Sequence, residues 1–164
     1  MRNDKTTETE AELCNCRGRK KEKNGANVCP LNGLCLKSNV VYRADVESNG
    51  IKKIYVGSTG TTFKTRYAGH KASLKNKDHC NPTTLSTYYW QGKNKGNEPI
   101  IKWSIVKEIH GKYKNINGCP LCNMERLEIA RSDKDKLLNK RNELMSSCPH
   151  HRNRFFPKYK TRKK

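Results

Sequence analysis

The stretch that decides the fold covers residues 39–57 and reads NVVYRADVESNGIKKIYVG. Its first part, 39–47, alternates apolar and polar residues, which is typical of a half-buried strand. Asn49 and Gly50 form a strong hairpin signal, because both central positions of the favoured two-residue turn need positive φ. A second strand is expected over 52–57. The sequence therefore predicts a β-hairpin at this point.

The rest of the chain predicts helices around one more strand. Thr61 or Thr62 can cap a helix that runs to Asn76, with Phe63, Tyr67 and Leu74 on its buried side. Further along we expect a helix over 84–91, a loop over 92–99, a well-buried strand over 100–109, and helices over 123–132 and 133–147. The expected fold class is α/β (α+β), a small domain with a three-stranded, largely antiparallel sheet flanked by helices.

The charge of the chain points to a polyanionic partner. The 164 residues hold 35 Lys+Arg against 15 Asp+Glu, a formal net charge of +20. Self-repulsion at that charge opposes compaction, and a polyphosphate relieves it through counterion release. Nucleic acid is therefore the expected partner.

Membrane insertion and secretion are not expected. No run approaches the roughly 18 apolar residues of a spanning helix, and the first 13 residues are polar and acidic. We expect an intracellular protein, in the nucleus if the source is eukaryotic. In a reducing compartment, paired cysteines indicate metal ligands before disulfides.

Four residues in the hairpin and the first helix suggest chemistry on phosphodiesters. Tyr42 and Tyr55 lie on the paired strands, and Arg66 and His70 are spaced to share one helix face. Phosphodiester cleavage needs a group that deprotonates water and a cation that stabilises the developing charge. The alternative for Tyr42 is a plain core residue.

These residues belong to a longer pattern, which resembles the GIY-YIG nuclease superfamily. The matching elements are VVY at 40–42, YVG at 55–57, Arg66-x-x-x-His70, Glu125 and Asn139, in register over about 39–140. CNCR, CPLNGLC, FKTRYAGHKAS, TTLSTYYW, IKWSIV, CPLC and LLNKRNEL are most similar to the endonuclease domain of Penelope-like retroelements. Val41 and Val56 replace isoleucines of the family motifs, which are conservative swaps in strands.

The resemblance implies a DNA endonuclease, a nickase that leaves 3′-hydroxyl and 5′-phosphate ends. Glu125 would hold one Mg²⁺ or Mn²⁺, and Tyr42 would act as the base, with Arg66 and Lys64 lowering its pKa. Tyr55 and His70 would orient water and phosphate, and Asn139 would support the site. The nick would prime reverse transcription, with an RNA template as a further partner inside a larger element protein. Phosphate contacts are expected from Gly57, Lys64, Lys71, Arg152, Arg154, Lys158 and Lys160.

The cysteines predict two structural zinc sites. Cys14, Cys16, Cys29 and Cys35 fit one tetrahedral ion, and Cys119, Cys122 and Cys148 with His150 or His151 fit a second. The domain organisation follows: 1–13 disordered, 14–38 a zinc-binding extension, 39–151 the nuclease domain and 152–164 a basic tail.

Several alternatives remain open at this level. Glu125 could be a surface glutamate, with Glu128 as its neighbour on the helix, and Asn139 could lie inside or cap a helix. The first four cysteines could be free thiols, Cys80 beside His79 could replace a ligand, and the tail could merely solubilise. The competing function is a non-catalytic, zinc-stapled nucleic-acid-binding module; an RNA-structural protein is a third.

Overall fold

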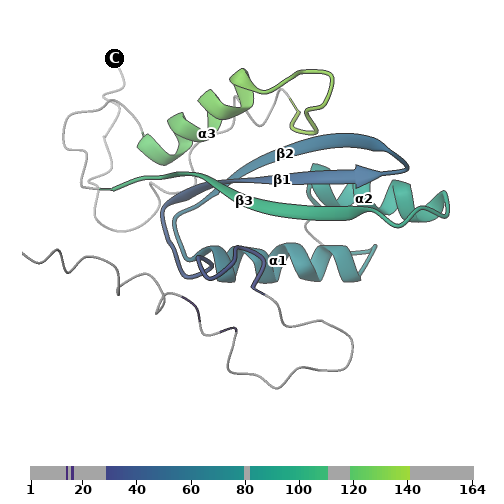
Figure 1. Ribbon diagram of the computed structural model, residues 1–164, viewed down its shortest axis with the longest axis horizontal. Helices are drawn as coiled ribbons and strands as arrows, with labels where there is room; N and C mark the ends of the chain where they lie inside the picture. The colour runs from purple at the N-terminus through teal and green to yellow at the C-terminus, as the bar shows by residue number, and fades with distance from the viewer. Residues whose placement is uncertain (1–13, 15, 17–28, 80–81, 111–118, 141–164) are drawn as a thin grey trace, which may run out of the picture.

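In the part of the chain that the structure describes, three helices lie on the two faces of a three-stranded sheet (Figure 1). The computed structural model describes residues 14, 16, 29–79, 82–110 and 119–140. The elements are β1 (Val40–Ser48), β2 (Ile51–Thr59), α1 (Phe63–Lys75), α2 (Thr84–Asn94), β3 (Ile100–Glu108) and α3 (Pro120–Arg131). The strand order is β2-β1-β3, and both pairings are antiparallel. The predicted sheet and the α+β class are confirmed.

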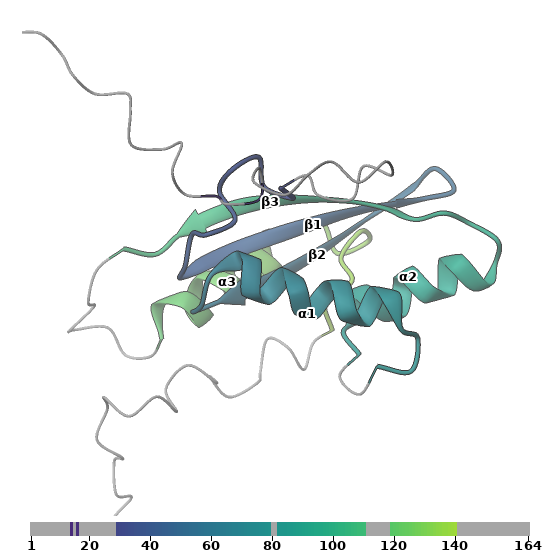
Figure 2. The same ribbon diagram turned by 90° about the horizontal axis from the view of Figure 1, so that it is seen from below.

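The hairpin forms where the sequence predicts it. Asn49 and Gly50 have φ values of 51° and 75°, and Ser48 pairs with Ile51 across the turn. Side chains then alternate between the two faces of the sheet. Tyr42 on β1 belongs to the core under α1 and α2, whereas Val41 belongs to the core under α3. Figure 2 shows α1 and α2 along one face of the sheet and α3 on the other.

The first two helices each begin after a capping threonine, and Thr62 is one of the two candidates that the sequence offers for α1. The Thr62 side chain accepts a hydrogen bond from the Thr65 N–H, and Thr83 forms a capping box with Ser86. The helix α2 continues to Asn94, beyond its predicted end, and its buried Gly92 lies against Pro99. Of the residues predicted on the buried side of α1, Phe63 is buried, and Tyr67 and Leu74 are half-buried.

Two predictions about the second half of the chain are wrong. The strand β3 is not well buried: it is an edge strand, its residues alternate between exposed and half-buried, and Ile100 is 62% exposed. No helix begins at 133, because the described residues 133–140 contain a turn followed by an extended segment; 141–147 lie outside the described residues. The helix α3 starts earlier than predicted, at Pro120, a residue well suited to a first helical turn.

The segment after α3 extends the sheet instead. The Ile54 N–H donates to the Lys136 carbonyl at 2.8 Å, and the Leu138 N–H donates to the Ile54 carbonyl at 2.7 Å. Leu137 thus forms a parallel bridge with Ile54. The outer edge of β2 is covered by this segment, which protects part of its backbone from pairing with another chain.

Gly57 carries the first testable prediction. A Cβ on this residue would lie 2.5 Å from the Tyr42 Oη, so Gly57→Ala must displace the tyrosine ring. We expect a loss of about 1–3 kcal/mol in the free energy of unfolding, measured by urea denaturation. The matched control is Gly69→Ala on α1, where a Cβ meets nothing within 4 Å. That change should stabilise the helix by up to about 1 kcal/mol; equal effects of the two substitutions would contradict the packing argument.

Candidate active site and metal centre

A hydrogen-bonded group of buried side chains lies between the hairpin and α1. The Arg66 Nε–H donates to the Tyr42 Oη at 2.9 Å, and the same hydroxyl is hydrogen bonded to the His70 Nε2 at 2.7 Å. Tyr55 on β2 completes the group, with its ring centroid 5.9 Å from that of His70. The structure therefore brings together all four residues that the hairpin and helix motifs single out.

Burial and charge determine the protonation of this group. Tyr42 is 0% and His70 2% exposed. Burial, and then the positive charge of Arg66, lower the pKa of His70 to about 3, so its imidazole is neutral near neutral pH. Although burial opposes it, the phenols of Tyr42 and Tyr55 raise the pKa of Arg66. The arrangement is a fixed cation beside a neutral base, joined by one phenol.

The lowered pKa of His70 predicts a pH-dependent stability. The unfolded chain protonates this imidazole below about pH 6.5, and the folded chain does so only near pH 3. The free energy of unfolding should therefore fall with decreasing pH in that window, by up to about 1.4 kcal/mol per pH unit. Urea denaturation from about pH 7 to about pH 5 measures the slope. His70→Gln should flatten it, and equal slopes for the two proteins would contradict the prediction.

Glu125 approaches β2 from the opposite face of the sheet. The Ser58 Oγ–H donates to the Glu125 Oε2 at 2.8 Å, so α3 holds this half-buried carboxylate against the strand. Ser58 directly follows Gly57, whose Cα position is covered by the Tyr42 hydroxyl. Glu125 thus contacts Ser58 from one face of the sheet, and Tyr42 contacts the neighbouring Gly57 from the other.

The remaining predicted phosphate contacts are divided between two parts of the chain. Lys64 is half-buried and Lys71 exposed, both on α1. The Tyr42 ring fills the space where a side chain of residue 57 would lie, so the lack of a Cβ at Gly57 allows this ring to pack against β2. Outside the described residues lie Arg152, Arg154, Lys158 and Lys160, together with segments 1–13 and 152–164.

The side chain of Asn139 forms two hydrogen bonds with the backbone of β2. Its Oδ1 accepts from the Val56 N–H at 2.8 Å, and its Nδ2–H donates to the Val56 carbonyl at 2.8 Å. The side-chain amide thereby continues the ladder that Lys136 and Leu138 begin. The alternative of a helical or capping asparagine is wrong, because the residue lies in the extended segment.

A single-atom exchange tests this amide. Asn139→Asp replaces the Nδ2 donor with an acceptor that faces the Val56 carbonyl, so we expect a loss of about 1–3 kcal/mol in stability. Denaturant unfolding measures the change. Asn123→Asp on the exposed surface of α3 carries the same charge change and should be close to neutral. Equal losses of stability in the two variants would show that the added charge, and not the lost hydrogen bond, causes the effect.

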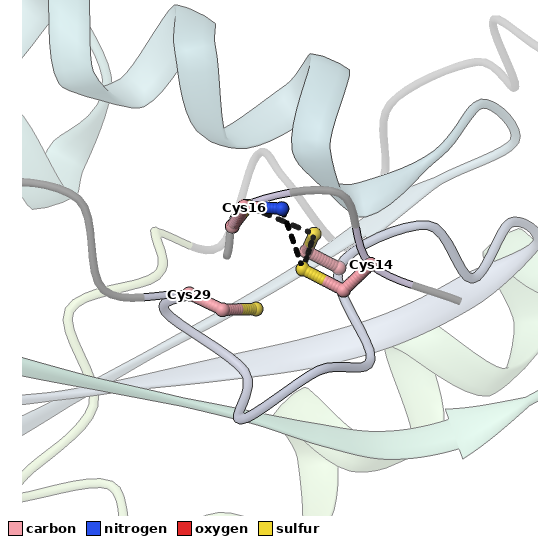
Figure 3. A group of neighbouring side chains, drawn as sticks. Cys14, Cys16 and Cys29 are labelled. Atoms are coloured by element: carbon pink, nitrogen blue, oxygen red, sulfur yellow. Dashed lines mark hydrogen bonds between the residues drawn. The ribbon is translucent and has the colours of Figure 1, made fainter. Parts of the chain in front are cut away.

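Four cysteines gather at the start of the described chain. Their sulfur atoms, from Cys14, Cys16, Cys29 and Cys35, all lie within 4.8 Å of one another. Figure 3 shows three of them, with the Cys16 N–H directed at the Cys14 sulfur at 3.3 Å. Although burial opposes it, hydrogen bonds from the Cys16 N–H and neighbouring thiols lower the pKa of Cys14 to about 7. The group can bind a metal ion through four thiols.

This cluster is connected directly to α1. We name residues 29–37 the cysteine loop. The Lys64 N–H donates to the Cys35 carbonyl at 2.7 Å, and the Phe63 N–H donates to the Lys37 carbonyl at 2.9 Å. These bonds satisfy backbone donors in the first turn, which lack partners within the helix. The cysteine loop therefore positions the helix that carries Arg66 and His70.

The second predicted metal site is only partly described. Cys119 and Cys122 lie at the start of α3, are 8% and 6% exposed, and belong to the core cluster under this helix. Cys148, His150 and His151 lie outside the described residues, as does Cys80. A metal held there would clamp the helix that carries Glu125.

Sequence reasoning missed two residues of the site. Ser58 orients Glu125, and Trp103 on β3 packs 5.9 Å from Tyr42 and 5.1 Å from His70, measured between ring centroids. The alternation of β2 would have placed Ser58 on the same face as Val56. No comparable signal marks Trp103, because its neighbours come from α1 and β1.

Comparison of the chain with protein-family models, with curated proteins and with solved structures found no match. Within the described residues, no helix has the length and apolar character that crossing a membrane requires.

Proposed function

We propose that this chain is a metal-dependent DNA endonuclease of the GIY-YIG type, similar to the endonuclease domain of Penelope-like retroelements. The supporting observation is the hydrogen-bonded group of Arg66, Tyr42 and His70. A tyrosine that only fills a hydrophobic core does not need both an arginine and an imidazole hydrogen bonded to its hydroxyl. A phenol that takes a proton beside a phosphate uses a cation to stabilise its ionised form and a second partner to orient its oxygen.

In this proposal, Tyr42, His70 and Arg66 each have a defined role in the cleavage reaction. Tyr42 loses its own proton to solvent and, as a phenolate stabilised by the charge of Arg66, takes a proton from the attacking water. His70, which its low pKa keeps neutral, orients this oxygen through its Nε2. Arg66, only partly buried, binds the scissile phosphate while its Nε remains on Tyr42. Because Tyr42 is fully buried, water has to enter between α1 and the hairpin before this transfer.

The chemistry of the donor atoms indicates which metal ion each candidate site would bind. Glu125 is a half-buried carboxylate oriented by Ser58, which fits a hard cation such as Mg²⁺ or Mn²⁺. Such an ion would stabilise the charge that develops on the phosphate. Cys14, Cys16, Cys29 and Cys35 form the four-thiolate set typical of structural Zn²⁺. A second zinc would use Cys119 and Cys122.

One observation favours a second candidate, a zinc-stapled nucleic-acid-binding module without catalysis. Tyr42 and His70 are 0% and 2% exposed, which suits a structural hydrogen bond as well as a catalytic one. Both candidates bind DNA, and only the endonuclease cleaves it.

Incubation of the full chain with supercoiled plasmid separates them. With Mg²⁺ we expect open-circular DNA whose new ends carry 3′-hydroxyl and 5′-phosphate groups, and none with a chelator of Mg²⁺. Sequencing of the ends also reports site preference. A protein that shifts the plasmid on a gel yet leaves it supercoiled in Mg²⁺ and in Mn²⁺ would be the binding module.

A further inference from the structure

A hollow of about 420 Å³ lies beside the active-site group, away from Glu125. Three parts of the chain form its walls: the cysteine loop, α1 and β3. Its lining residues are Pro30, Asn32, Tyr67, Ile101, Lys102 and Trp103. The volume falls in the range of small-molecule sites, about 300–1,000 Å³.

The aromatic walls suit a flat ligand. The rings of Tyr67 and Trp103 meet edge to face, with centroids 5.6 Å apart and planes at 85°. Both side chains are only half-buried, so neither ring is fully enclosed. Stacking of a nucleobase on such a ring contributes about 1–3 kcal/mol and tolerates any base.

The polar groups at the rim suit a nucleotide rather than a purely apolar ligand. Asn32 is exposed, and its amide offers the donor and acceptor pair that base edges match. Lys102, between Ile101 and Trp103 on β3, also borders the hollow. The net charge of +20 favours a nucleic acid over a neutral metabolite.

We propose that this hollow binds an unpaired nucleobase of a DNA strand, stacked on one of the two perpendicular rings of Trp103 and Tyr67 and contacted at its edge by the other ring and by Asn32. The assignment rests on the DNA-binding part of the proposed function and not on catalysis. Trp103 also contacts the rings of Tyr42 and His70, so a base bound here lies next to the group that would cut the strand. DNA with a single-stranded or extruded nucleotide is therefore the substrate class.

Fluorescence of 2-aminopurine in a single-stranded oligonucleotide tests the assignment, because stacking on an aromatic ring quenches it. We expect quenching on addition of the full chain, and about a 5- to 100-fold weaker affinity for Asn32→Gly and Tyr67→Leu. Glycine keeps the positive φ of 49° that Asn32 adopts, so the loop should retain its shape. The control is Asn49→Gly at the hairpin turn, an exposed residue with a φ of 51° that does not line the hollow, and this variant should bind as the wild type does.

Two results would overturn the proposal. One is equal quenching by the wild type and by both variants. The other is equal quenching of the same probe inside a fully paired duplex, since a paired base cannot enter the hollow. Both readouts are independent of cleavage, so a chain that never nicks DNA could still confirm this site.

Discussion

Glu125→Gln should lower the rate of plasmid nicking on the order of a thousand-fold while leaving DNA affinity nearly unchanged. The substitution removes the negative charge that a divalent cation needs. Its amide oxygen can still accept the hydrogen bond that Ser58 donates at 2.8 Å, so α3 should keep its place against β2. Single-turnover nicking at saturating protein, with gel-shift affinity measured in parallel, separates the chemical step from binding.

Glu128→Gln provides the control for this experiment. Glu128 lies one turn further along α3, is half-buried like Glu125, and contacts Arg131 at 3.8 Å. Its replacement removes the same charge from the same helix and should leave nicking within about two-fold of wild type. Loss of activity in Glu128→Gln alone would transfer the metal-ligand assignment to that residue. No loss in either variant would remove the carboxylate from the mechanism.

The sequence predicted those parts of the fold that depend on local signals. Asn49 and Gly50 specify their turn through backbone conformation alone, and Thr62 and Thr83 specify helix starts through side chains that bond their own first turn. The grouping of Arg66 with His70 follows from helical spacing. Each of these features needs no knowledge of what lies across the sheet.

The features that were missed depend on partners distant in the sequence. The apolar run of β3 suggested a well-buried strand, yet its position at the sheet edge is determined by the pairing of β1 with both neighbours. Residues 136–139 were predicted to be helical from their sequence, but they are extended because β2 offers an unpaired edge. Gly57 has a packing role that only the Tyr42 ring reveals.

Loss of the proposed zinc from the cluster of Cys14, Cys16, Cys29 and Cys35 should produce the largest fall in stability. The four thiols lie within 4.8 Å of one another, and Cys35 is 0% exposed. A structural zinc in such a site contributes about 10–16 kcal/mol in isolated peptides, so even partial coupling to this domain is worth several kcal/mol. We expect Cys35→Ser to lower the melting temperature by about 10–20 °C and to remove one zinc ion per chain.

The effect should extend to the active-site group, since the Cys35 and Lys37 carbonyls hold the first turn of α1. Arg66 follows in the next residues of that helix and donates to Tyr42 at 2.9 Å, so nicking should fall together with zinc content. Cys80→Ser is the matched control, because Cys80 belongs to neither predicted site. Elemental analysis and thermal melts of both variants give the answer: a Cys35→Ser protein with unchanged zinc and an unchanged melting temperature would show that these thiols bind no structural metal.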